Sequence, residues 1–167
     1  MSRLVIRFLW LSLTLSTIGC DQVTKQVAAA ELADGVRRSL LHDAVRLQYT
    51  ENAGAFLGLG TTLPPAIRTP VLVSAAAFLL IGVLFALRQP RLALSYRLGL
   101  YLILAAGVSN LLDRLIRGRV IDFLNLGIGP LRTGIFNVAD VALMLGLALA
   151  IMAHRPATHT TLESTQH

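Results

Sequence analysis

The sequence predicts an all-α membrane protein with four transmembrane helices and a small extracytoplasmic β-sheet between helices 1 and 2. Composition is the first reason: 54% of the 167 residues are hydrophobic and only 14% are charged, whereas soluble domains carry roughly a quarter charged residues. Four long apolar segments are the second reason. The third is one stretch in which apolar and polar residues alternate. The length corresponds to about one domain.

The four apolar segments are close to the length that a membrane crossing requires. A helix needs about 20 residues to cross roughly 30 Å of hydrocarbon, and the expected spans are 4–24, 68–87, 92–112 and 135–153. We therefore assign 1–154 to one integral-membrane domain. Residues 155–167 are polar and without apolar periodicity, so we expect a disordered cytoplasmic tail.

The first segment has an alternative interpretation as a cleaved signal peptide. It has a basic start, an apolar middle and a small-residue end, and Thr17-Ile18-Gly19-Cys20 is similar to a lipobox. Thr17 stands where leucine is usual, and three more spans follow. We therefore favour a retained span.

Basic residues predict the orientation of the spans. These residues form three groups. Arg3 and Arg7 precede the first span, Arg88, Arg91 and Arg97 separate the second span from the third, and Arg155 follows the fourth. Cytoplasmic loops are enriched in Lys and Arg, so we expect both termini in the cytoplasm. Arg114, Arg117 and Arg119 then lie on the outer side, against this rule, and we expect them to have local partners.

The outer segment 28–65 is expected to form part of a sheet on the bilayer surface. Val45, Leu47 and Tyr49 alternate with polar residues, which is typical of a half-buried strand. Asn52 and three glycines that follow it, Gly54, Gly58 and Gly60, favour turns.

Charge and cysteine content exclude several classes of protein. The net charge is +6, but the basic residues form short clusters between apolar segments, so we expect no nucleic-acid partner. The single cysteine, Cys20, excludes an intramolecular disulfide. The four histidines have no ligand-like spacing, and we expect neither a metal nor a cofactor.

Four of the nine acids abut or interrupt apolar segments: Asp21, Asp113, Asp122 and Asp140. A charge in hydrocarbon costs about 2.5–3.5 kcal/mol even on a lenient scale, so such carboxylates are candidates for function. Interfacial aspartates that reach lipid headgroups are the alternative. All four fall near the outer ends of their segments, which favours one shared site.

The third and fourth segments carry the most specific spacing. Asn110 and Asp113 are three residues apart, on one face of a helix. Asn137 is a suitable N-cap, and Asp140 falls in the first turn that follows. A capping box is the alternative for this pair. It accounts for the helix start, but not for the presence of one acid in a segment otherwise suited to lipid.

Five segments resemble, in order, the signature blocks of lipoprotein signal peptidase (signal peptidase II): Asp21-Gln22-Val23-Thr24-Lys25, Asn52-Ala53-Gly54-Ala55-Phe56, Asn110-Leu111-Leu112-Asp113-Arg114, Val120-Ile121-Asp122-Phe123 and Phe136-Asn137-Val138-Ala139-Asp140. The resemblance implies a monomeric, multi-pass aspartic endopeptidase of the bacterial inner membrane, with its site near the outer leaflet. Such enzymes cut diacylglyceryl-modified prolipoproteins just before the lipidated cysteine. Membrane lipid is the other implied partner.

The resemblance implies that Asp122 and Asp140 are the catalytic pair. Two close carboxylates share a proton, so one can activate water while the other donates to the scissile carbonyl. The other matched positions are expected to bind substrate or support the site: Asp21, Lys25, Asn52, Gly54, Asn110, Asp113, Arg114, Asn137 and Ala139.

Three of these supporting positions carry more specific expectations. Asp21 and Lys25 are expected to form a structural i,i+4 pair. Arg114 is expected to pair with a carboxylate, with Asp113 the nearest. Asp113 is the main rival to Asp122 for catalysis; we prefer Asp122, because the arginine beside Asp113 would keep that group ionised and structural.

The sequence departs from the family at positions that affect packing. Ala106 and Ser109 stand where glycine is usual, and Ile135 stands where proline or a small residue often precedes Phe-Asn. Two other functions remain open. One is a small transporter or proton-relay subunit, and the other is an inactive relative that binds lipoproteins.

Overall fold

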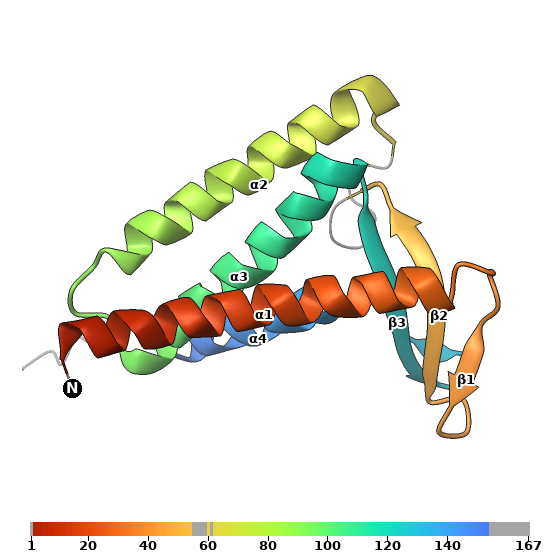
Figure 1. The fold of residues 1–167 in the computed structure, drawn as a ribbon, viewed down its shortest axis with the longest axis horizontal. Helices are drawn as coiled ribbons and strands as arrows, with labels where there is room; N and C mark the ends of the chain where they lie inside the picture. Colours follow the sequence, from red (N-terminus) through yellow and green to blue (C-terminus); the bar gives the residue numbers. More distant parts are fainter. Residues whose placement is uncertain (1, 55–59, 61, 154–167) are drawn as a thin grey trace, which may run out of the picture.

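The computed structural model describes residues 2–54, 60 and 62–153. Their helices coincide with the four apolar segments: α1 (Arg3–Glu31), α2 (Pro65–Leu87), α3 (Leu94–Arg117) and α4 (Val138–Ala153). A small sheet lies at one end of the helices, and its strands run across the helix axes (Figure 1). The expected disordered tail and the positions Ala55, Phe56 and Gly58 lie outside the described residues.

Three of the helices are long and apolar enough to cross a membrane: Arg3–Glu31, Ala66–Leu87 and Leu94–Arg117. The fourth, Val138–Ala153, is apolar but shorter. Large side chains such as Phe78 and Leu79 on α2 are 76% and 68% exposed. Exposed apolar helix faces of this kind fit a protein whose solvent is lipid.

Helix α1 continues seven residues beyond its predicted end at 24. Its buried positions are Asp21, Lys25 and Ala28, which are spaced four and three residues apart and so form one stripe along the helix. The polar pair and the alanine are buried on the same side, so the helix extends through the charged residues instead of ending at them.

The sheet is antiparallel, in the order β1 (Arg38–Leu40), β2 (Val45–Asn52), β3 (Val120–Ile128) and β4 (Leu131–Arg132). Strand β2 confirms the alternating segment. The expected location between helices 1 and 2 accounts for only half of the sheet, because β3 and β4 lie between α3 and α4. Most of β3 is buried, and a buried strand lacks the alternation that reveals a half-exposed one.

A small core joins the sheet to the helices. Ala28 and Leu32 at the end of α1 pack with Phe123 of β3, and Leu47 and Tyr49 of β2 cover them. At the C-terminal end of α3, Gly118 has φ 73°, a left-handed conformation that glycine adopts without strain. This turn leads the chain directly from α3 into β3.

Candidate active site

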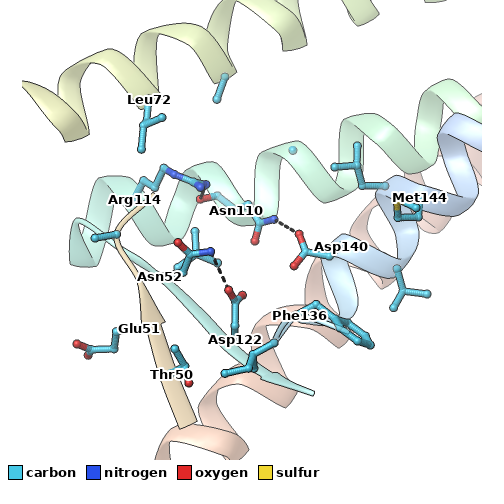
Figure 2. A pocket seen from close by; sticks show the side chains of 18 of the residues that line it. Thr50, Glu51, Asn52, Leu72, Asn110, Arg114, Asp122, Phe136, Asp140 and Met144 are labelled. Carbon is cyan, nitrogen blue, oxygen red and sulfur yellow. Dashed lines mark hydrogen bonds between the residues drawn. The ribbon is translucent and has the colours of Figure 1, made fainter. Parts of the chain in front are cut away.

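Asp122 and Asp140 line one cavity of about 1090 Å³. Asp122 lies in β3, whereas Asp140 lies in the first turn of α4. Figure 2 shows both carboxylates on the same wall, with Asn52 and Asn110 directed toward them. The pairing of β2 with β3 sets Thr50 opposite Asp122, and this register brings Asn52 into reach.

Two asparagine amides donate hydrogen bonds to Asp122. Asn52 Nδ2 lies 2.9 Å from Oδ2, and Asn137 Nδ2 lies 2.7 Å from Oδ1. The orientation of each amide is defined by a backbone donor, because Gly54 N and Asp140 N donate to the respective Oδ1 atoms at 2.9 Å. Both oxygens of Asp122 therefore accept a hydrogen bond from an uncharged group.

Asp140 also accepts two hydrogen bonds. The Asn137 backbone N–H donates to Oδ2 at 3.2 Å, and Asn110 Nδ2 donates to Oδ1 at 3.2 Å. Because Asp140 N donates in return to the Asn137 side chain, Asn137 and Asp140 form a capping box at the start of α4, which was the alternative interpretation of this pair. Asn137 contacts both carboxylates, so it fixes one relative to the other.

Burial raises the pKa of Asp122 from its ordinary value of 3.8 to about 6. The hydrogen bonds from Asn52 and Asn137 act in the opposite direction, and the neighbouring Asp140 carboxylate raises the pKa further. The side chain is only 3% exposed, so the charged form loses nearly all of its hydration. Asp122 therefore holds a proton at pH values where an exposed aspartate has lost it.

A buried ionic cluster lies beside this pair. Lys25 Nζ is 2.6 Å from Asp21 and 2.8 Å from Asp113, and all three side chains are fully buried. The expected i,i+4 pair of Asp21 and Lys25 is thereby confirmed. Asp21 also accepts hydrogen bonds from Ser109 Oγ and from Ala139 N, each at 2.7 Å.

Asp113 does not line the cavity, unlike its rival Asp122. Its carboxylate is bound by Lys25, by Arg117 at 2.6 Å and by Gln22 Nε2 at 3.2 Å. Its two cationic partners and its position outside the cavity lining suit a structural role.

The expected pairing of Arg114 with Asp113 is wrong. Neighbouring residues on a helix do not face each other, so the side chains of Asp113 and Arg114 project in different directions. Arg114 donates instead to the carbonyls of Asn110 at 3.1 Å and Gly54 at 2.9 Å. The expectation that Arg114, Arg117 and Arg119 have local partners is nevertheless confirmed. Arg117 binds Asp113, and Arg119 binds Glu51 at 2.6 Å.

Sequence reasoning missed two groups of residues. Gln22 and Ser109 belong to the hydrogen-bond network of Asp21 and Asp113. Gln22 lies within a matched motif and Ser109 replaces a usual glycine, but neither position signals this role by its spacing. Thr133 and Gly134 line the cavity, and nothing in their spacing signals it. Among residues 2–54, 60 and 62–153, no group of three or more His, Cys, Asp or Glu could hold a metal ion.

This arrangement has the components of general acid–base hydrolysis. Two carboxylates in a mostly desolvated site can share one proton, so that the pair offers both a base and an acid. The ionised member can accept a proton from water, and the protonated member can donate to a carbonyl oxygen. The uncharged amide donors hold both carboxylates without forcing both to ionise.

Comparisons with known proteins agree on one family. The family model described as signal peptidase (SPase) II matches residues 13–155. Relatives named lipoprotein signal peptidase include proteins of Aquifex aeolicus, 30% identical over 95% of this chain and 95% of the relative, and of Symbiobacterium thermophilum, 32% identical over 84% and 90%. A protein of Chlorobium phaeovibrioides with the same name is 35% identical over 84% of this chain and 86% of the relative.

Solved structures share the fold. Two structures of a bacterial membrane enzyme, determined by the in meso method at 2.3 and 1.9 Å resolution, superpose with TM-scores of 0.75 and 0.76. They are 24% and 23% identical in sequence, and they cover 86% and 89% of this chain and 85% and 94% of their own. With the family match over most of its length, the chain belongs to the signal peptidase II family of proteases.

Proposed function

We propose that this protein is an aspartic endopeptidase of the bacterial inner membrane that removes signal peptides from diacylglyceryl-modified prolipoproteins. Cleavage occurs just before the lipidated cysteine. The observation that carries the proposal is the pair Asp122 and Asp140 on the wall of one large cavity. The relatives' shared name, lipoprotein signal peptidase, supports the class of substrate.

Asp122 and Asp140 act together as the catalytic pair. Water attacks the scissile carbonyl as the ionised carboxylate takes its proton, and the protonated carboxylate donates to the carbonyl oxygen. As the tetrahedral intermediate collapses, the carboxyl group that took the proton from water passes a proton to the nitrogen, and the carbonyl oxygen returns its proton to the other carboxylate. The C–N bond breaks, the amine of the new N-terminal cysteine leaves, and no covalent enzyme intermediate forms. The pair titrates as a unit.

The cavity suits a substrate that is part peptide and part lipid. Its polar wall contains the two aspartates with Asn52 and Asn110, whereas α2 contributes Leu72, Ala75, Ala76 and Leu79. A volume of about 1090 Å³ is at the upper end of ligand pockets. An acyl chain can contact the apolar wall while the scissile peptide lies against the carboxylates.

The other matched residues hold this geometry. Asn52, Asn110 and Asn137 orient the catalytic pair, and Arg114 ties the backbone at Gly54 to α3. A second set holds the helices around the site through the buried ionic cluster: Asp21, Lys25, Asp113 and Ala139. No cofactor is needed for this chemistry.

We further propose a monomer with four spans, 4–24, 68–87, 92–112 and 135–153, in one domain of residues 1–154. Both termini lie in the cytoplasm, and the sheet lies outside, with the site near the outer leaflet. A proton relay would place acids near mid-span, whereas Asp122 is in a strand and Asp140 is in the first turn of its helix. This placement favours the peptidase.

The test is cleavage of a diacylglyceryl-modified prolipoprotein by the purified protein in detergent. We expect wild type to release the signal peptide. Asp122→Asn and Asp140→Asn should each lose about 10²–10⁴-fold in rate, the usual contribution of an acid or base. Asp34→Asn, an exposed acid at the end of α1, is the matched control and should retain full activity.

Two outcomes contradict the proposal. Full activity in either active-site variant, with the fold intact, overturns the assignment of the pair. Equal cleavage of the unlipidated precursor overturns the proposed substrate class. An inactive wild type that still binds the lipidated precursor would indicate the lipoprotein-binding relative instead.

A further inference from the structure

We propose that Lys25 is a positioning residue, which acts on the catalytic pair through the side-chain amide of Asn110. The inference rests on the proposed function, because it concerns the carboxylates assigned there to catalysis. Lys25 lies on α1 outside the cavity lining, and its side chain is fully buried. Its Nζ is 2.7 Å from Asn110 Oδ1.

The ammonium determines which arm of the Asn110 amide faces Asp140. An ammonium can only donate, so the oxygen arm of the amide must face Lys25. The nitrogen arm then faces Asp140 Oδ1, at 3.2 Å. The other contact to Asn110 Oδ1, from Asn137 Nδ2, is 3.4 Å long. Without Lys25, only this weak contact would hold the oxygen arm.

Lys25 itself is held by three neighbours. Its Nζ donates a hydrogen bond to Asn110 Oδ1 and forms ion pairs with the carboxylates of Asp21 and Asp113. Each lies within 2.8 Å of Nζ. Buried ion pairs contribute little net stability, because desolvation offsets their attraction. Fixing the direction of a neutral amide gives this cluster a role beyond stability.

A second connection leads from Lys25 to the same carboxylate. Asp21, held by Lys25 at 2.6 Å, accepts a hydrogen bond from the backbone N–H of Ala139 at 2.7 Å. Ala139 directly precedes Asp140 in the first turn of α4. The cluster therefore holds both the backbone that carries Asp140 and the amide that binds its side chain.

The test is a mutant cycle in a charge-matched background. Lys25→Met alone would leave two buried carboxylates short of a partner and is expected to fold poorly. We therefore combine it with Asp113→Asn, so that one positive and one negative charge are removed together. Four proteins are compared: Asp113→Asn, the same with Lys25→Met, the same with Asn110→Ala, and the same with both.

We expect Lys25→Met to lower kcat about tenfold in this background, as misplacement of a reacting group does, with KM changed less than about twofold. In the Asn110→Ala background, Lys25→Met should lower kcat by clearly less than tenfold, because the amide is gone and only the connection through Asp21 and Ala139 remains. The control is Arg117→Met in the wild-type background, which removes a partner of Asp113 without touching Asn110. It should lower Tm and leave kcat unchanged.

Additive losses in the two backgrounds, or an unchanged kcat in Lys25→Met, overturn the inference. A second readout needs no turnover: NMR of the Asn110 side-chain amide in detergent micelles. Its protons should exchange with water faster in Lys25→Met than in the Asp113→Asn parent, and equal exchange rates would contradict the inference. An inactive wild type overturns the proposed function instead, and the amide exchange then decides the role of Lys25.

Discussion

At the scale of single residues, uncharged amides surround the two carboxylates of the cavity. Asn52, Asn110 and Asn137 each donate through Nδ2 to a carboxylate and accept through Oδ1 from a group of fixed direction. A lysine or arginine in direct contact would hold both aspartates ionised. Asparagine gives direction without that charge, so the pair can keep its shared proton.

The raised pKa of Asp122 makes a prediction about stability against pH. The unfolded chain loses the proton near pH 3.8 and the folded chain near pH 6, so the folded state binds more protons between these values. Stability contributed by the protonated group is present below pH 3.8 and lost as pH rises through 6. Relative to wild type, Asp122→Asn should therefore gain about 3 kcal/mol of unfolding free energy over this window.

Unfolding in detergent, followed from pH 3.5 to 8, measures this difference. The difference in unfolding free energy between Asp122→Asn and wild type should increase up to about pH 6 and then remain constant, because Asp122 is ionised in both the folded and the unfolded state above its folded pKa. Asp34→Asn serves again as the control, at an exposed acid. A difference between Asp122→Asn and wild type that is independent of pH would contradict the raised pKa.

Ser109, which stands where glycine is usual in the family, adds a hydroxyl to the buried hydrogen-bond network. Its Oγ donates to Asp21 at 2.7 Å and accepts from Gln22 Nε2 at 3.0 Å, in a fully buried position. Hydrogen bonds to charged groups contribute about 1.5–3 kcal/mol. We expect Ser109→Ala to lower the unfolding free energy by this amount, and Ser95→Ala, at an exposed position of α3, to change it little.

At the scale of elements, the contact between α3 and α4 sets the distance between Asn110 and Asp140. The helices approach at two facing glycines. A Cβ at Gly146 would lie 2.7 Å from the Gly99 carbonyl oxygen, and one at Gly99 would lie 2.6 Å from that of Gly146. Real Cβ atoms do not approach backbone so closely, so any larger residue must separate the helices.

We therefore expect Gly146→Ala to destabilise the protein by about 1–3 kcal/mol, as overpacking does, and to lower activity as well. Gly82→Ala is the matched control, since a Cβ there meets nothing within 4 Å. Alanine is the better helix former, so this variant should be unchanged or slightly more stable. Equal Tm values for the two variants would show that the helices adjust without strain.

Helices and one strand could be predicted from the sequence, whereas β3 could not. The apolar segments gave four helices because hydrophobicity over a helix length is a local property. Strand β3 is mostly buried, and its partner β2 lies about 70 residues away in the chain, a pairing that local pattern cannot reveal. The predicted partner of Arg114 was wrong for a related reason. Its acceptors are the backbone carbonyls of Asn110 and Gly54, and because every residue has a carbonyl, the sequence does not show which ones accept.

At the scale of the whole molecule, the candidate site draws on segments from most of the chain. Asn52, Asn110, Asp122 and Asp140 come from β2, α3, β3 and α4, and all four line the cavity. The residues alone indicated that acids gather near one end of the spans. Only the resemblance of ordered motifs selected Asp122 and Asp140 among them, because the proximity of distant segments is a property of the fold.

The orientation of the molecule in the membrane can be tested with single cysteines. The arginines between α2 and α3 predict a cytoplasmic position for that loop, whereas Arg117 and Arg119, near the sheet, bind carboxylates. In a Cys20→Ser background, Val36→Cys near the start of the sheet and Gln89→Cys after α2 provide exposed reporters. We expect a membrane-impermeant maleimide to label position 36 in intact spheroplasts, and position 89 only after lysis. The opposite pattern would place the sheet and the carboxylates in the cytoplasm, where exported prolipoproteins could not reach them from the outer leaflet.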